Sequence, residues 1–228
     1  MRRRFFILTV VLAAVLLAVA VFVGTRRSAA PDRARVVLCL GDSMTEGDFG
    51  GYPAQLRRLA KEAGFRARIV SAARPGNNSR EYLVFLRNSD LLRKHTPDIV
   101  LLMLGTNDAR VDGDRIPADE FERNMNLIID RIEGAEGGQR HRVQTLFLAT
   151  IPPILAIDLP NFSDESRRRI VKEINPAIRR LARKRNLNLV SVERLFLENR
   201  DLLPGIHPNA AGYRRMAETF FAAIHPRL

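Results

Sequence analysis

Short apolar runs alternate along this chain with segments in which apolar residues recur at every third or fourth position. The runs have the length of strands, and their nearly continuous apolar character is typical of parallel strands buried on both faces. Five strands alternating with helices predict a three-layer α/β/α domain with a mostly parallel five-stranded sheet. The predicted strands lie at 35–40, 66–71, 98–104, 143–150 and 187–192.

Proline and glycine mark the expected ends of the helices between these strands. Pro53 suits a first helical turn and Gly64 suits the position after a last one. From Ser79 onward, helical spacing predicts one helix that Pro97 ends. The predicted helices lie at 53–63, from 79 toward 97, from 117 to 134, at 166–185 and from about 208.

The first part of the chain has a different character. Residues 5–24 contain no charged residue, and as a helix they would span about 30 Å, the thickness of a membrane's hydrocarbon core. A cleaved signal peptide is the alternative, but its apolar region is usually shorter, and Pro31 disfavours cleavage after Ala30. We expect a transmembrane signal anchor at 1–27, a linker at 28–34 and a domain at 35–228, outside the cytoplasmic membrane.

Composition narrows the possible partners. The formal net charge is +12, and the five arginines before residue 28 leave +7 for the remainder, where there is no aromatic-interleaved basic patch. Nucleic acid is therefore not an expected partner, and the basic run at 167–169 is interpreted as a solvated helix face. Cys39 is alone, so no intramolecular disulfide forms, and no spacing of His, Cys and Glu predicts a metal site.

Loops that carry polar side chains or exposed amides follow four of the predicted strands. Active sites of open parallel sheets lie at this end of the strands. Ser43 follows the first strand, Gly76 the second, Asn107 the third and His207 the fifth. A hydroxyl nucleophile, amide donors for an oxyanion and a histidine base are what acyl transfer needs. The pattern predicts that these residues meet at one edge of the sheet.

These residues lie in four blocks that resemble the motifs of the SGNH hydrolases, also called GDSL esterases and lipases. The blocks are Gly41-Asp42-Ser43 with the residues to Gly47, then Gly76, then Gly105-Thr106-Asn107-Asp108, and finally His207-Pro208-Asn209. The resemblance spans the chain from about residue 35 to its end. It implies the flavodoxin-like SGNH hydrolase fold and an ester hydrolase that needs no cofactor.

The resemblance also assigns roles to individual residues. It makes Ser43 the nucleophile and His207 the general base. It places the oxyanion between the Ser43 amide, the Gly76 amide and the Asn107 side chain. Substrates would be carboxylic esters, either small molecules or glycan-linked, cleaved through an acyl-enzyme intermediate.

One position departs from the family pattern. The family usually carries an aspartate three residues before the histidine, and here Pro204 occupies that place. Asp201 could act instead if the loop bends differently, and Glu198 or a backbone carbonyl are further options. The missing acid leaves two alternatives to a hydrolase: a non-catalytic carbohydrate- or lipid-binding module, or an acyltransferase acting on an envelope glycan. The loops at 108–116 and 154–162 are expected to shape the pocket.

Overall fold

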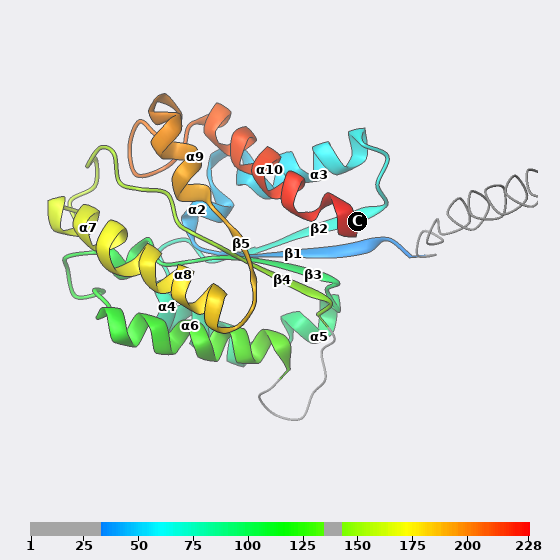
Figure 1. Cartoon of the computed structure of the whole chain (residues 1–228), viewed down its shortest axis with the longest axis horizontal. Helices are drawn as coiled ribbons and strands as arrows, with labels where there is room; N and C mark the ends of the chain where they lie inside the picture. The colour runs from blue at the N-terminus through cyan, green and yellow to red at the C-terminus, as the bar shows by residue number, and fades with distance from the viewer. Residues whose placement is uncertain (1–32, 135–142) are drawn as a thin grey trace, which may run out of the picture. The chain divides into compact units, whose positions relative to one another are not determined.

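Five strands of the chain form one sheet in the order β2-β1-β3-β4-β5. In this computed structural model, which describes residues 33–134 and 143–228, every neighbouring pair of strands is parallel. The predicted three-layer α/β/α domain with a five-stranded sheet is therefore confirmed (Figure 1). The strands are β1 (Arg35–Gly41), β2 (Ala67–Ala73), β3 (Ile99–Met103), β4 (Thr145–Ala149) and β5 (Asn188–Val190).

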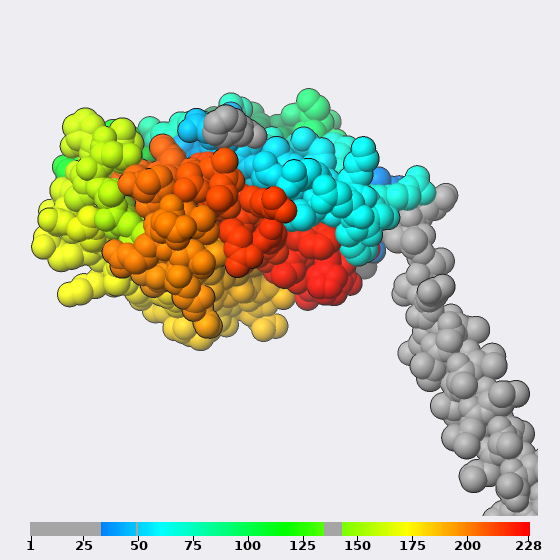
Figure 2. Space-filling view, turned by 90° about the horizontal axis from the view of Figure 1, so that it is seen from above, coloured from blue at the N-terminus to red at the C-terminus, as the bar shows by residue number. Residues whose placement is uncertain are grey.

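Helices cover both faces of the sheet (Figure 1). α3, α9 and α10 cover one face, which Figure 2 shows from above, and α4, α6 and α8 cover the other. The helices are α2 (Ser43–Glu46), α3 (Gly51–Glu62), α4 (Ser79–Asn88), α5 (Leu91–His95), α6 (Ala118–Glu133), α7 (Asp164–Arg169), α8 (Asn175–Lys184), α9 (Val192–Glu198) and α10 (Ala210–Ile224).

The core lies on either side of the central strands β1 and β3. All five residues of β3 are buried, as are residues 36–41 of β1, which explains their continuous apolar sequences. On the α3/α10 side, Tyr52 stacks on Phe220 with ring centroids 4.4 Å apart. The carboxyl ends of β1 and β3 thus project from the best-packed part of the domain, and they carry two of the four motif loops.

The helices differ from expectation in two ways. The single helix predicted from Ser79 toward Pro97 is two helices, because α4 ends at Asn88 and Ser89 has an extended backbone with φ −98° and ψ 150°. Ser89 and Asp90 follow α4, and the side chains of serine and aspartate can bond to nearby backbone groups in place of the helical hydrogen bonds. This favours a break in the helix at these two residues. The short helices α2 and α9 were not predicted, because a helix of one or two turns leaves little periodicity in the sequence.

The predicted basic helix contains a π-helical turn, Ile170–Ile174, between α7 and α8. Pro176 lacks an N–H group, so the regular hydrogen-bond pattern is interrupted here. The neighbouring Asn175 side chain accepts from the Ile151 N–H at 2.9 Å and donates to the Ile151 carbonyl at 3.0 Å. The residue that follows the π-helical turn therefore holds the segment after β4 in place through two hydrogen bonds.

The predicted anchor at 1–27 and most of the linker at 28–34 lie outside the described residues. Of the helices in the described part of the chain, none has both the length and the apolar character needed to cross a membrane. The compact unit that contains the sheet spans Ala34–Leu228.

Candidate active site

Ser43 is presented by a sharp turn at the end of β1. It is the first residue of α2, and the Asp42 carboxylate caps this short helix by accepting from the Met44 N–H at 2.9 Å. A Cβ at Gly41 would lie 2.2 Å from Thr45 Oγ1 and 2.3 Å from the Met103 carbonyl oxygen. Only glycine therefore allows the chain to turn this closely, and the turn leaves the Ser43 side chain partly exposed.

His207 lies opposite this serine although 164 residues separate them in the sequence. Its Nε2 atom is 2.9 Å from Ser43 Oγ, which is hydrogen-bond distance. The histidine precedes α10, whose N-cap, Asn209, accepts from the Gly212 N–H at 2.9 Å. The structure therefore brings together the two residues predicted as nucleophile and base.

Gly76 occupies a tight turn after β2. The Asn77 N–H donates to the Arg74 carbonyl at 3.1 Å, and Gly76 has a φ of +83°. Pro75 and Gly76 thus hold the central positions of a turn of the type II kind, where a positive φ favours glycine. The Arg74 N–H donates to the Gly41 carbonyl at 2.8 Å, which ties this turn to the end of β1.

Asn107 joins the third loop to this turn. Its buried side chain donates from Nδ2 to the Asn77 carbonyl at 3.0 Å, and the second hydrogen of that amide remains available. Among the described hydrogen bonds, none uses the N–H of Ser43 or of Gly76. The three donors predicted for an oxyanion therefore lie on loops that hydrogen bonds hold together.

A cavity of about 180 Å³ opens beside Ser43 and His207, and Glu46, Gly47, Asp48 and Pro75 complete its lining. A neighbouring hollow of about 280 Å³ shares Glu46. The loops at 108–116 and 154–162 contribute no residue to the lining of these two hollows, and their expected role in shaping the pocket stays a prediction. The walls of the first cavity come from the turn after Ser43, from Pro75 and from His207.

Neither carboxylate considered as a substitute for the missing acid forms a described hydrogen bond with the histidine. The Asp201 side chain is exposed, and among the described residues no hydrogen bond joins its carboxylate to His207. Its carbonyl accepts from Asn209 Nδ2 at 3.0 Å, so the residue supports the loop through its backbone. Glu198 pairs with Arg194 at 2.7 Å. The imidazole has one described hydrogen bond, the contact with Ser43.

The model of the GDSL-like Lipase/Acylhydrolase family matches residues 39–215 and so includes all four motif blocks. The chain belongs to this family. An acetylxylan esterase of Xylanibacter ruminicola is 28% identical over 207 residues, which cover 82% of this chain but 42% of that protein. The chain thus spans about two-fifths of the length of this relative.

Solved structures resemble this GDSL-like domain in fold. A lipase/acylhydrolase from Enterococcus faecalis has a TM-score of 0.71 at 22% identity, covering 85% of this chain and 97% of that one. An acetylxylan esterase from Geobacillus stearothermophilus has a TM-score of 0.67 at 23% identity, covering 84% of this chain and 94% of that one. At these identities the likeness establishes the fold.

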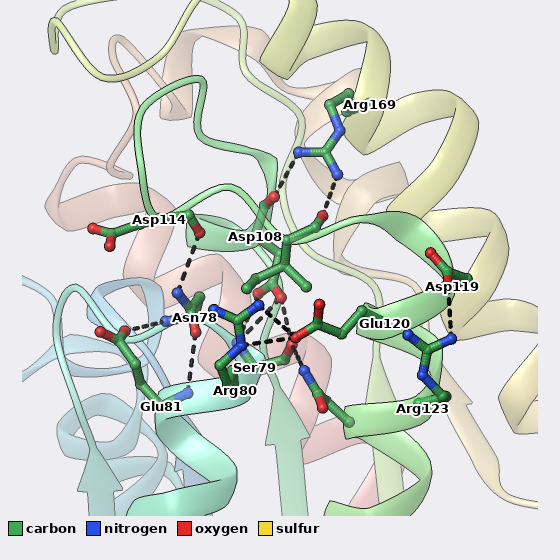
Figure 3. A network of polar contacts seen from close by, with 12 residues as sticks. Asn78, Ser79, Arg80, Glu81, Asp108, Asp114, Asp119, Glu120, Arg123 and Arg169 are labelled. Carbon is green, nitrogen blue, oxygen red and sulfur yellow. Dashed lines mark hydrogen bonds and ion pairs between the residues drawn. The ribbon is translucent and has the colours of Figure 1, made fainter.

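Two buried carboxylates, Asp42 and Asp108, belong to the motif loops of the GDSL-like domain. Asp108 accepts from the Ser79 N–H and, at 2.5 Å, from the Ser79 hydroxyl (Figure 3). Burial, with a further contribution from the nearby Asp42, raises the pKa of Asp108 to about 7. Burial likewise raises the pKa of Asp42 to about 6, and its Oδ2 atom has no partner among the described residues. Both groups serve their loops structurally.

Arg169 was interpreted from the sequence as part of a solvated helix face, and this was wrong. Its side chain is 2% exposed, and it donates to the carbonyls of Asp108 and Ile116 (Figure 3). It also pairs with Glu173 at 3.0 Å, the only contact that its sequence spacing could have indicated. The guanidinium therefore braces the loop that carries Asn107.

Among the described residues, no cluster of His, Cys, Asp and Glu side chains could hold a metal ion.

Proposed function

We propose that this domain is a serine esterase that removes acetyl or similarly short acyl groups from carbohydrate. One observation carries the proposal: the 2.9 Å contact between Ser43 Oγ and His207 Nε2 at the mouth of a cavity. A serine hydroxyl is a weak nucleophile until an adjacent base accepts its proton, and this contact gives the base access to that proton. Membership of the lipase/acylhydrolase family supports the same chemistry.

In this proposal Ser43 Oγ attacks the ester carbonyl carbon while His207 Nε2 accepts the hydroxyl proton. The oxyanion that forms accepts hydrogen bonds from the Ser43 N–H, the Gly76 N–H and Asn107 Nδ2. The ester bond then breaks, and His207 returns the proton to the departing alcohol. Water, deprotonated by the same imidazole, finally attacks the acyl-serine, and the carboxylic acid leaves as His207 returns the proton to Ser43 Oγ.

The cavity favours a short acyl group and a neutral substrate. A volume of about 180 Å³ is below the range of roughly 300–1,000 Å³ for sites that hold drug-sized ligands, which favours a short acyl group. Glu46 and Asp48 in the lining would repel an anionic substrate such as a phospholipid. Arg57 and Ser71 beside the neighbouring hollow supply polar groups for sugar hydroxyls. The relatives named as acetylxylan esterases support this choice of substrate.

The test uses the full-length protein in detergent. We expect it to hydrolyse p-nitrophenyl acetate and acetylated xylo-oligosaccharides, to act poorly on a p-nitrophenyl ester of a long acyl chain, and to lose these activities in Ser43→Ala. Activity that survives in Ser43→Ala would contradict the proposed nucleophile. Binding of the oligosaccharide without turnover would favour the binding-module alternative, and acetyl transfer to an added sugar would favour the acyltransferase.

We further propose that residues 5–24 hold the domain at the outer face of the cytoplasmic membrane. Their length and lack of charge support insertion into the membrane. The protein should then sediment with membranes and resist extraction by high salt, and protease added to intact spheroplasts should degrade the domain. A form found free in the medium and shortened at its N-terminus would support the cleaved signal peptide instead.

A further inference from the structure

Asn209 closes the loop that carries His207 by donating to the carbonyls of Leu202 and Asp201, each at 3.0 Å. Pro204 and Pro208 have no N–H group, and Pro204 stands where the family usually has its acid. Between these prolines, a single described hydrogen bond connects the backbone to a distant part of the chain. In this bond the Ile206 N–H donates to Asp158 Oδ1 at 3.1 Å, across 48 residues of sequence.

Gly205 makes room for this carboxylate. A Cβ at Gly205 would lie 2.1 Å from Asp158 Oδ2, and its three nearest heavy atoms would all belong to Asp158. Gly205 is absent from the residues with positive φ, so its backbone does not itself require glycine. The missing side chain at this position therefore serves the close approach of Asp158.

The segment that carries Asp158 is itself held firmly. It connects β4 with α7, and it passes beside the loop before α10 (Figure 1). Ile154 and Phe162 are buried near its two ends. Arg167 donates to the carbonyl of Ile154 at 2.8 Å, and the Asn161 carbonyl accepts from the Val111 N–H at 3.1 Å. These contacts hold the backbone on both sides of Asp158 in place. Asp158 can therefore help to fix the position of another loop.

We propose that Asp158 is a positioning residue for His207 and compensates for the aspartate that is missing at position 204. Its carboxylate fixes the Ile206 amide, and the adjoining peptide then holds the imidazole opposite Ser43. The inference rests on the proposed function, because it assigns Asp158 to the same Ser43–His207 pair. It differs from a conventional triad in two respects: the acid comes from another loop, and it acts through the backbone.

The test is a double-mutant cycle with two neighbouring positions. Asp158→Ala should lower kcat by about 10- to 100-fold with little change in KM, because a small misplacement of a catalytic group costs up to about that factor. Gly205→Ala should cause a similar loss by displacing the carboxylate. The double variant should be no worse than either single variant, because the methyl group added at position 205 meets no carboxylate once Asp158 is gone.

Two further variants separate positioning from general destabilisation. Asp158→Asn keeps an oxygen acceptor for the Ile206 N–H and should recover most of the activity. Asp164→Ala is the control. Asp164 lies at the end of the same segment, and its exposed carboxylate pairs with Arg167. This variant should keep wild-type kcat. Hydrogen exchange of the Ile206 amide should speed up in Asp158→Ala and stay slow in both Asp158→Asn and the Asp164→Ala control.

Several results would overturn the inference. These are wild-type kcat in Asp158→Ala, additive losses in the double variant, an equal loss in Asp158→Asn, or a loss in Asp201→Ala with none in Asp158→Ala. Unchanged exchange at Ile206 in Asp158→Ala would also overturn it, even if the protein has no esterase activity. A wild-type protein that hydrolyses no ester would instead contradict the proposed function.

Discussion

Replacing Asp42 by asparagine is expected to stabilise the protein at alkaline pH and to change its stability much less in acid. Asp42 is fully buried beneath the nucleophile turn. Asparagine keeps the oxygen that accepts from the Met44 N–H, so the helix cap survives. It replaces only Oδ2, which has no partner among the described residues. The substitution therefore removes a buried charge at almost constant shape.

The size of the effect follows from the pKa of Asp42, which burial raises from 3.8 to about 6. A pKa raised by folding means that the neutral acid is favoured in the folded protein, so its stabilising contribution is complete below about pH 4 and is lost as the pH rises through about 6. At roughly 1.4 kcal/mol for each pKa unit, the loss amounts to about 3 kcal/mol. Asparagine cannot ionise and does not suffer this loss.

The measurement is urea unfolding followed by circular dichroism at about pH 4 and about pH 8. The stability of Asp42→Asn relative to wild type should increase by about 3 kcal/mol between the two pH values. Asp119→Asn is the matched control, because Asp119 is an exposed carboxylate that pairs with Arg123 on the surface. A difference between Asp42→Asn and wild type that does not vary with pH, or that becomes less favourable toward alkaline pH, would refute the reasoning.

Three further predictions concern the site and its support. Asn107→Ala should lower kcat by about 100- to 1,000-fold with little change in KM, since it removes one oxyanion donor, and steady-state kinetics on p-nitrophenyl acetate checks this. Arg169→Met should cost about 3 kcal/mol or more in urea unfolding, because the buried carbonyls of Asp108 and Ile116 lose their donor. Glu46→Ala should raise KM for acetylated xylo-oligosaccharides but not for p-nitrophenyl acetate, because Glu46 borders both hollows.

The sheet and three of the four motif residues could be predicted from the sequence for a common reason. Strands buried on both faces leave continuous apolar runs, and the residue that follows each run lies at one edge of a parallel sheet. Ser43, Gly76 and Asn107 could be placed at this edge in that way. His207 lies beyond α9, so its place opposite Ser43 followed from the resemblance to the family motifs. The spacing of Phe121, Met125 and Ile132 likewise predicted α6, because a helix of four turns repeats its pattern several times.

The supporting contacts could not be predicted in this way. Asp158 reaches Ile206 across 48 residues and Arg169 reaches Asp108 across 61, through loops whose course no periodicity describes. Arg169 also lies in a run of three arginines of which it alone is buried. Burial of one member of such a run depends on how the π-helical turn after α7 faces the β3 loop, and that is a tertiary property.

The central claim, that His207 activates Ser43, is tested most directly by labelling with a fluorophosphonate and measuring the intact mass. The account predicts a single adduct on wild-type protein, located at Ser43 by peptide mapping, no adduct on Ser43→Ala, and labelling of His207→Ala slower by several orders of magnitude. An adduct elsewhere, or labelling of His207→Ala at the wild-type rate, would contradict the account.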